Sequence, residues 1–278
     1  MATSDERAAH PASTVENRVL PGLSDYATET FAVAAAEVQK LYHDPLELLT
    51  RAVQPILWLL LFGEVMARVR GVAPGEIPYL DFLAAGILAQ SALFVAIFYG
   101  IAAIWERDLG VLQRYLVSPA PRSALVLGKA MSAGVRALSQ ALIVYVLALL
   151  LGVGIDLQLL HIIGVAVVIV LGSALFATLS LIIACIVRTR ERFMGIGQVL
   201  TMPIFFASNA IYPLSLMPRW LNVVSHGNPL TYEVDALRAL MLVRGTSEYS
   251  LPLDVAVLLL TTAVLTAIAA RMYGRMGY

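Results

Sequence analysis

Charged residues are scarce in this chain. They make up 14% of its 278 residues, whereas 59% are hydrophobic, and the mean hydropathy is +0.81. A soluble globule of this size needs more polar surface than such a composition supplies. The scarcity of charge therefore excludes a soluble protein and predicts an integral membrane protein. The 19 basic and 19 acidic residues cancel, so the total charge indicates no nucleic-acid partner.

Cysteine and metal ligands are also scarce. Cys185 is the one cysteine, which excludes a disulfide within the chain and a cysteine-based metal site. It lies in an apolar run, where a packed small side chain is expected. His43, His161 and His226 are scattered, with no HExxH motif or carboxylate cluster beside them. We therefore assign no metal or proteolytic site.

The sequence has no GxxxxGK[ST] phosphate-binding loop. Its one Gly-Lys pair, Gly128-Lys129, is followed by Ala130, and Ser123 stands where the upstream glycine would be required. If nucleotide drives this protein, another chain must bind it.

The N-terminal segment lacks the apolar core of a signal peptide. Residues 1–23 are predicted to be a disordered cytoplasmic tail. Residues 24–43 are predicted to form an amphipathic helix in the membrane interface, because Glu29, Glu37 and Lys40 lie opposite an apolar stripe. Residues 44–278 then form the membrane domain.

Six apolar segments follow, and a helix needs roughly 20 residues to cross a bilayer. The predicted spans are 46–67, 80–105, 134–155, 161–187, 193–213 and 253–272. The first span contains Gln54-Pro55, which predicts a kink. The fold class is thus an all-α membrane protein with six transmembrane helices.

Basic residues predict the orientation. The tail, the loops after the second and fourth spans, and the C-terminus carry fourteen of the 19 lysines and arginines. The positive-inside rule places these segments, and both termini, in the cytoplasm. The location is the cytoplasmic (inner) membrane of a prokaryote.

The stretch "ERDLGVLQRYLVSPAPRSALVLGK", Glu106 to Lys129, is unusually charged. Its leucines and arginines project from opposite sides of a predicted short helix that ends before Pro119. Residues 106–130 then form a cytoplasmic loop with a helix lying flat on the membrane surface. Two interpretations stay open: a loop that only sets topology, or a docking surface for a cytoplasmic partner.

The fifth span and the external segment 214–250 contain further candidates. Pro203 interrupts the fifth span, and polar residues near it either pack between helices or line a pathway. Candidate pathway residues are Gln54, Gln198, Thr201, Phe205, Phe206 and Asn209. Breaks at Met217-Pro218 and Asn228-Pro229 predict short re-entrant helices, with Trp220 at the headgroup level.

Two segments resemble the permeases of type 2 ABC transporters, the exporter group. The first is the Glu106 to Lys129 stretch. The second is "PIFFASNAIYPLSLMPRWLNVVSHGNPLTYEVDALRAL", Pro203 to Leu240, with Tyr-Pro-Leu, Met-Pro-x-Trp-Leu, Asn-Pro-Leu-Thr-Tyr and Asp-Ala-Leu-Arg in order. The similarity covers roughly residues 30–275 and is strongest for the drug-resistance and polysaccharide-export branches. Ser208-Asn209 departs from the family, which often has Ser-Gly there.

The resemblance implies an elbow helix at 24–43, six spans, a second permease chain as homodimer or heterodimer, and two copies of a cytoplasmic ABC ATPase. ATP and magnesium would bind in that partner, and no cofactor in this chain. The implied ATPase-coupling residues are Glu106, Arg107, Asp108, Gly110, Arg114, Pro119 and Arg122. The second cytoplasmic loop contributes Arg188, Arg190, Glu191 and Arg192. The implied external gate comprises Tyr212, Pro213, Pro218, Trp220, Asn228 and Pro229.

The predicted function is export of an amphipathic drug, lipid or lipid-linked glycan. The alternative is an ion-coupled secondary transporter or channel, which would need ionisable residues deep in the spans and inverted repeats. The four long apolar runs contain no such residues. A membrane enzyme would need a cluster of acids, bases or metal ligands, and the sequence shows none.

Overall fold

The structure, a computed structural model, describes residues 53–69, 77–109, 122–187 and 189–273. The predicted tail and elbow helix, and most of the loop between the second and third spans, lie outside these ranges. Within them the regular elements are helices, joined by turns and loops, and the β structure is limited to one isolated bridge between Ile155 and Leu242.

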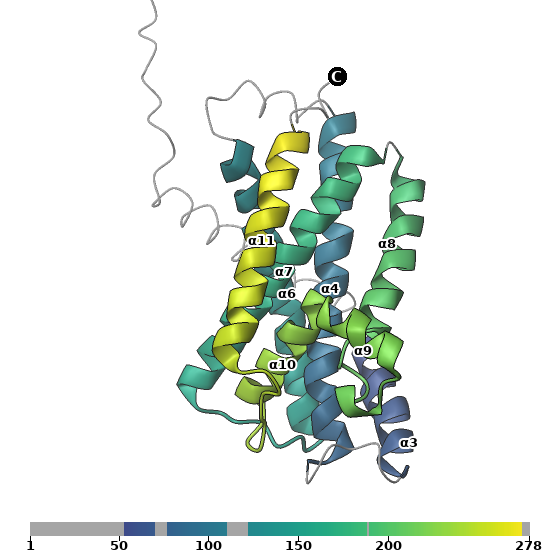
Figure 1. Ribbon diagram of the computed structural model, residues 1–278, viewed down its shortest axis with the longest axis vertical. Helices are drawn as coiled ribbons and strands as arrows, with labels where there is room; N and C mark the ends of the chain where they lie inside the picture. The colour runs from purple at the N-terminus through teal and green to yellow at the C-terminus, as the bar shows by residue number, and fades with distance from the viewer. Residues whose placement is uncertain (1–52, 70–76, 110–121, 188, 274–278) are drawn as a thin grey trace, which may run out of the picture.

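Four long helices form the body of the molecule (Figure 1): α4 (Tyr79–Asp108), α6 (Arg122–Leu150), α7 (Leu159–Ile186) and α11 (Leu251–Tyr273). Each contains an apolar stretch long enough to cross a membrane. They overlap the predicted spans 80–105, 134–155, 161–187 and 253–272. These four helices confirm that the chain is an all-α integral membrane protein.

Two predicted spans correspond to shorter helices. The apolar helix Val53–Ala67 contains a π-helical stretch η1 (Leu57–Gly63) and ends in α3 (Glu64–Ala67). The π-helical stretch begins two residues after Pro55. The fifth predicted span appears as α8 (Arg190–Phe206), 17 residues with Pro203 inside. The described residues thus contain four helices of full spanning length rather than six.

Some helix ends differ from the predicted spans: α4 and α6 extend into charged residues, and α6 ends near a glycine. α4 continues to Asp108 and α6 already begins at Arg122, because a helix can extend beyond its apolar portion. α6 ends before the predicted residue 155. Gly152 has φ 78°, its N–H donates to the Leu149 carbonyl and the Val153 N–H donates to the Ala148 carbonyl. This Schellman motif requires a residue that tolerates positive φ.

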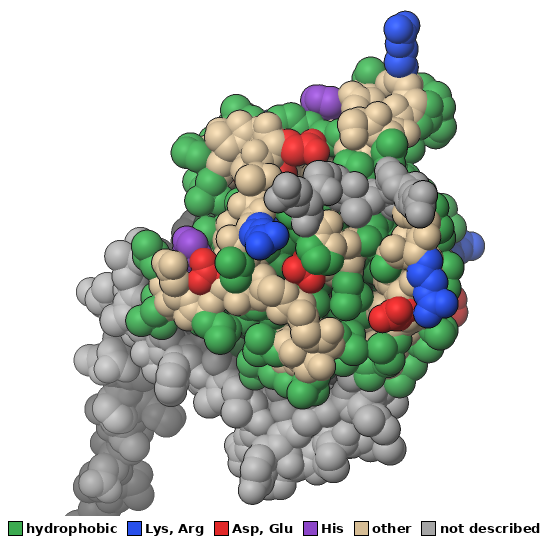
Figure 2. All heavy atoms as spheres, turned by 90° about the horizontal axis from the view of Figure 1, so that it is seen from below, with side chains coloured by type: hydrophobic (Ala, Val, Ile, Leu, Met, Phe, Trp, Pro, Cys, Tyr) green, Lys and Arg blue, Asp and Glu red, His purple; other side chains and the backbone are tan. Residues whose placement is uncertain are grey.

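The long helices alternate in direction, so the bundle has two ends. The end of α4 and the starts of α6 and α8 lie at one, which we call the basic end. The start of α4 and the short helices α9 (Arg219–His226) and α10 (Pro229–Met241) lie toward the other, the hairpin end (Figure 1). Figure 2 looks onto the hairpin end and shows acidic, basic and histidine side chains scattered among apolar ones.

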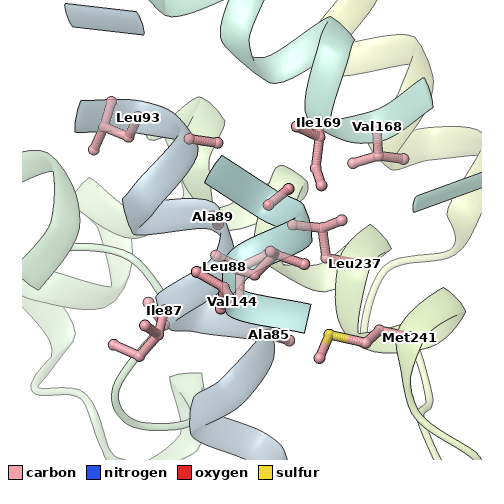
Figure 3. Close-up of a cluster of buried hydrophobic side chains, with 14 of the residues drawn as sticks. Ala85, Ile87, Leu88, Ala89, Leu93, Val144, Val168, Ile169, Leu237 and Met241 are labelled. Carbon is pink, nitrogen blue, oxygen red and sulfur yellow. The ribbon is translucent and has the colours of Figure 1, made fainter. Parts of the chain in front are cut away.

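The α9–α10 hairpin enters the bundle. Asn228 caps α10 by accepting a hydrogen bond from the Leu230 N–H (3.0 Å), and Pro229 occupies the first turn. Ten of the thirteen α10 residues are buried. Figure 3 shows Leu237 and Met241 of α10 in one apolar cluster with side chains of α4, α6 and α7.

Two glycines of α7 set the position of α10. A Cβ at Gly172 would lie 2.2 Å from the carboxyl carbon of Glu233, and one at Gly164 would lie 3.1 Å from Leu240. The order of these contacts shows that α10 runs antiparallel to α7. Gly172 is halfway along α7, so α10 begins near the middle of the bundle and returns toward its hairpin end.

α8 attaches to the bundle along one narrow stripe. Its buried residues, Phe193, Gly197, Thr201 and Phe205, recur every fourth position. Phe193 lies beside Gly100 of α4, and Gly197 lies beside Ile97 and Phe98. The other faces of α8 are mostly exposed in the single chain.

The Gly172→Ala substitution should strain the contact between α7 and α10, because its methyl group would overlap the carboxyl group of the fully buried Glu233, which would have to move. Overpacking of this kind typically destabilises a protein by about 1–3 kcal/mol. Thermal unfolding of the purified protein should therefore show a lower Tm for Gly172→Ala. Gly195→Ala is the matched control, since its Cβ would meet nothing within 4 Å. Gly172→Ala combined with Glu233→Ala should recover most of the loss. Equal Tm values for the two glycine variants would contradict the close contact.

Candidate functional site

The basic end joins two segments that are distant in sequence. Asp108, on the last turn of α4, accepts a hydrogen bond from the Arg190 guanidinium at the start of α8 (3.1 Å). The same guanidinium lies 3.6 Å from the centre of the Trp105 ring, a cation–π contact. Arg107 donates to the Val187 carbonyl oxygen (3.3 Å). We call these contacts the α4–α8 clasp.

A further ion pair links α4 to α6, between Glu106 and Lys129. The acidic side chains remain accessible, with exposed fractions of 28% for Glu106 and 41% for Asp108. Ion pairs this exposed contribute little stability individually. Their geometry instead holds the ends of α4, α6 and α8 in one cluster. The structure thus brings Glu106, Arg107 and Asp108 together with Arg190, while Glu191 and Arg192 are exposed beside them.

Other predicted residues of this end lie outside the described ranges: Gly110, Arg114, Pro119 and Arg188. For Arg122 the structure describes only the backbone at the start of α6. The predicted flat helix between α4 and α6 likewise lies outside the described residues. Those assignments stay predictions.

The predicted pathway residues divide into two groups. Thr201, Phe205 and Asn209 are fully buried, and the Thr201 hydroxyl donates to the Gly197 carbonyl (2.6 Å). Gln54, Gln198 and Phe206 are exposed on the single chain. The first group packs between elements, whereas the second faces outward.

An aromatic cluster connects the first helix with α8. The ring of Trp58 lies 5.1 Å from Phe62, 5.6 Å from Phe205 and 6.4 Å from Phe206 between centroids. Beside it an open pocket of about 320 Å³ is lined by Leu57, Trp58, Leu61, Phe62 and Val65. Sequence reasoning found Phe205 and Phe206 but missed Trp58 and Phe62, whose spacing of four residues on an apolar helix was the available signal.

Two of the predicted external gate residues, Asn228 and Tyr212, contact the end of α8. Asn228 donates from its side chain to the Ile204 carbonyl of α8 (2.7 Å), and the Tyr212 hydroxyl donates to the Phe206 carbonyl. Pro213 is buried and Pro218 precedes α9. Trp220 is 70% exposed. Pro229 begins α10 next to the Asn228 cap.

Asp235 organises the loop between α10 and α11. Its carboxylate accepts hydrogen bonds from the Ser247 hydroxyl (2.7 Å), the Glu248 N–H (2.9 Å) and the Tyr249 N–H (3.1 Å). Burial, and then the nearby Asp235 charge, raise the pKa of Glu248. Burial is also the main cause that raises the pKa of Tyr249 to about 12. The loop is therefore a fixed structure at the hairpin end.

Arg238 fastens α10 to its neighbours. Its guanidinium donates to the Asn209 carbonyl (2.9 Å) and lies 3.8 Å from the centre of the Phe82 ring on α4. A Cβ at Gly245 would lie 2.0 Å from the Arg238 carbonyl oxygen, so the loop folds back against α10. The Asp-Ala-Leu-Arg element was recognised in the sequence, but these partners are too distant along the chain to be predicted from it.

Among the described residues, no group of three or more histidine, cysteine, aspartate or glutamate side chains could hold a metal ion. What the arrangement provides is a helical bundle with a polar cluster at one end, an aromatic pocket on its side and a helical hairpin inserted from the other end.

Comparison with known proteins identifies relatives along most of the chain. A chain named as transport permease ycf38 of Cyanophora paradoxa is 28% identical over 217 residues, which cover 77% of this chain and 74% of the relative. The daunorubicin resistance ABC transporter permease protein DrrB1 of Streptomyces coeruleorubidus is 24% identical over 234 residues, covering 84% and 80%. Nodulation protein J of Rhizobium leguminosarum bv. trifolii is 28% identical over 197 residues, covering 70% and 74%.

The family match agrees with these relatives. Residues 28–242 match the ABC-2 type transporter family, a range that includes the α4–α8 clasp, the aromatic cluster and the hairpin. The resemblance read from the two sequence segments is thereby confirmed. The chain belongs to the ABC-2 type transporter family.

Proposed function

We propose that this chain is the transmembrane subunit of an ATP-driven exporter that moves an amphipathic drug, lipid or lipid-linked glycan out of the cytoplasm or inner leaflet. The observation that carries the proposal is the family match over residues 28–242. The lack of a phosphate-binding loop in the sequence supports a division of labour in which a separate subunit hydrolyses ATP.

The ATPase docks at the basic end in this proposal. Two copies of it serve a pair of permease chains, either identical or different, and ATP with magnesium binds in those ATPase subunits. The α4–α8 clasp supports this arrangement, because motion imposed on the end of α4 would reach the start of α8 directly through Asp108 and Arg190.

Six spans complete the proposed topology. Val53–Ala67 would be the visible part of the first span, and α8 with the turn after it would be the fifth. The basic end would face the cytoplasm of a prokaryote, as the distribution of lysine and arginine predicts. The α9–α10 hairpin would then be a re-entrant element on the external side.

The aromatic pocket supports an amphipathic cargo. Its lining is apolar, and the ring of Trp58 lies beside those of Phe62 and Phe205, so the pocket suits the apolar part of such a molecule. A relative named for daunorubicin resistance agrees with a cargo of this chemical type.

One observation favours the alternative of an ion-coupled transporter or channel. Glu233 is fully buried against the middle of α7, and ion-coupled carriers use ionisable groups at that depth. The family match favours transport driven by ATP. The two proposals differ in their source of energy, so an experiment that varies this source separates them.

The function should be tested in vesicles that contain the permease with its ATPase. Export of a fluorescent amphipathic cargo should require ATP and magnesium, and it should continue when an ionophore removes proton and sodium gradients. The purified permease alone should show no ATP hydrolysis. Transport that follows an ion gradient and ignores ATP would support the alternative.

The topology can be tested with single cysteines in the Cys185→Ala background. Glu191 and Thr246 are exposed at opposite ends of the bundle. An impermeant thiol reagent added to intact cells should label Thr246→Cys and leave Glu191→Cys unlabelled until the membrane is opened. Thr246 is chosen rather than its neighbour Gly245 because a side chain at Gly245 would collide with the Arg238 carbonyl oxygen. The reverse labelling pattern would show that the hairpin end, and not the basic end, faces the cytoplasm.

ATPase docking can be separated from internal packing by a charge swap. Glu106→Lys breaks the pair with Lys129, whereas Glu106→Lys with Lys129→Glu restores an opposite-charge pair. If Glu106 contacts the ATPase, both variants should co-purify poorly with it. A desolvated interface charge left unpaired costs roughly 2–5 kcal/mol, about thirtyfold or more in affinity.

Glu248→Lys, at the hairpin end, is the control and should bind the ATPase normally. Recovery of binding by the swap would assign Glu106 to the internal pair with Lys129.

A further inference from the structure

We infer that Glu233 is a proton-binding site: its carboxyl group is protonated while the α9–α10 hairpin is seated, and it releases that proton when the hairpin opens to water. The inference concerns this chain alone. It holds whether ATP or an ion gradient drives transport.

The position of Glu233 is the first observation. Its side chain is fully buried, and neither carboxyl oxygen has a hydrogen-bond partner among the residues that the structure describes. The carboxyl group occupies the space that a side chain at Gly172 would fill, 2.2 Å from the site of its Cβ. Gly172 is the fourteenth residue of the 28-residue helix α7, about 20 Å from its first residue at 1.5 Å per residue. The acid therefore lies deep in the bundle.

The surroundings of Glu233 are the second observation. Its neighbours on α10 one turn later, Leu237, and two turns later, Leu240 and Met241, are buried apolar side chains. An ionised carboxylate without a partner is strongly disfavoured in such an environment, and the group becomes neutral instead. The seated hairpin thus binds a proton that a solvated glutamate would lose at neutral pH.

Charged groups on α10 itself have other partners. The Asp235 carboxylate is occupied by the Ser247 hydroxyl and two backbone N–H groups. The Arg238 guanidinium is held by the Asn209 carbonyl and the Phe82 ring. The Tyr232 hydroxyl donates to the His226 carbonyl.

α4, α7, α9 and α11 pack against α10, and their titratable groups are also placed elsewhere. Each of these groups lies outside hydrogen-bonding distance of the Glu233 carboxyl group. They are Tyr79, Asp81, Tyr99, Glu106, Arg107 and Asp108 on α4; His161 and Cys185 on α7; Arg219 and His226 on α9; and Asp254 and Arg271 on α11. Among those on α7, His161 precedes Gly172 by eleven residues and contacts Asp156 (2.7 Å).

Thermodynamic linkage gives the direction of the pH effect. The seated hairpin binds one more proton than the open hairpin, so a rise in pH favours opening. The effect begins above about pH 4.3, where a solvated glutamate loses its proton. It reaches at most tenfold in the opening equilibrium per pH unit, because one proton is released.

Infrared spectroscopy tests the bound proton directly. The purified protein in lipid at neutral pH should show the C=O stretching band of a protonated carboxylic acid. Glu233→Gln, which keeps the size of the side chain, should lose that band or part of it. Glu64→Gln removes an exposed glutamate of the first helix and should leave the band unchanged. An unchanged spectrum for Glu233→Gln would overturn the inference.

Cysteine labelling tests the linkage. Val234 is fully buried beside Glu233, so Val234→Cys in the Cys185→Ala background reports hairpin opening. Its labelling rate is divided by that of the exposed Thr246→Cys variant, which corrects for thiol ionisation. The corrected rate should rise with pH, by up to tenfold per unit, when Glu233 is present, and stay flat in Glu233→Gln. Equal pH profiles would show that Glu233 is not the linked group.

Neither measurement needs ATPase or cargo. Failure of both would leave the proposed exporter function intact, and failure of ATP-dependent export would leave the proton site intact.

Discussion

Hydrogen bonding of the backbone in apolar surroundings is the constraint on which this fold depends. Peptide groups away from water must find partners within the chain, so long apolar segments become helices. At the hairpin end, the backbone groups of the loops also find hydrogen-bond partners within the chain. The Asp156 N–H donates to the Met241 carbonyl (2.8 Å), the Val243 N–H donates to the Gly154 carbonyl (3.0 Å), and the Gly154 N–H donates to Asp81 (3.2 Å). These bonds tie the α6–α7 loop to the exit of α10, and the hairpin is held by the same segments that close the bundle.

The two ends of α8 illustrate how the parts of the molecule are connected. At the basic end Arg190 contacts both Asp108 and Trp105 of α4. At the other end the Ile204 carbonyl accepts a hydrogen bond from Asn228, the cap of α10. A displacement of α8 therefore affects the cytoplasmic cluster of the proposed topology and the hairpin together. The aromatic contact of Phe205 with Trp58 adds the first helix to this connected set.

Sequence patterns predicted the parts of the fold that local physics decides. Hydropathy located the four long helices, and Asn228-Pro229 predicted the start of α10 because cap and proline chemistry act within one turn. The end of α8 was less predictable, because the helix continues past Pro203 and stops at Phe206, before the predicted residue 213. The contacts of Asp108 with Arg190 and of Glu233 with Gly172 were not predicted. Both join residues far apart in sequence, and their spacing carries no periodic signal.

The contact between Gly172 and Glu233 also limits how this sequence can diverge. The space at the contact is shared, so a larger residue at position 172 requires either a shift of the Glu233 carboxyl group or a smaller residue at position 233. The two positions should therefore change together during evolution. In relatives with a small apolar residue at position 233, position 172 no longer needs to be glycine. An alignment would show this as correlated substitutions between the fourth predicted span and the hairpin. Relatives that keep the matched pair would be those in which the hairpin enters the bundle to the same depth.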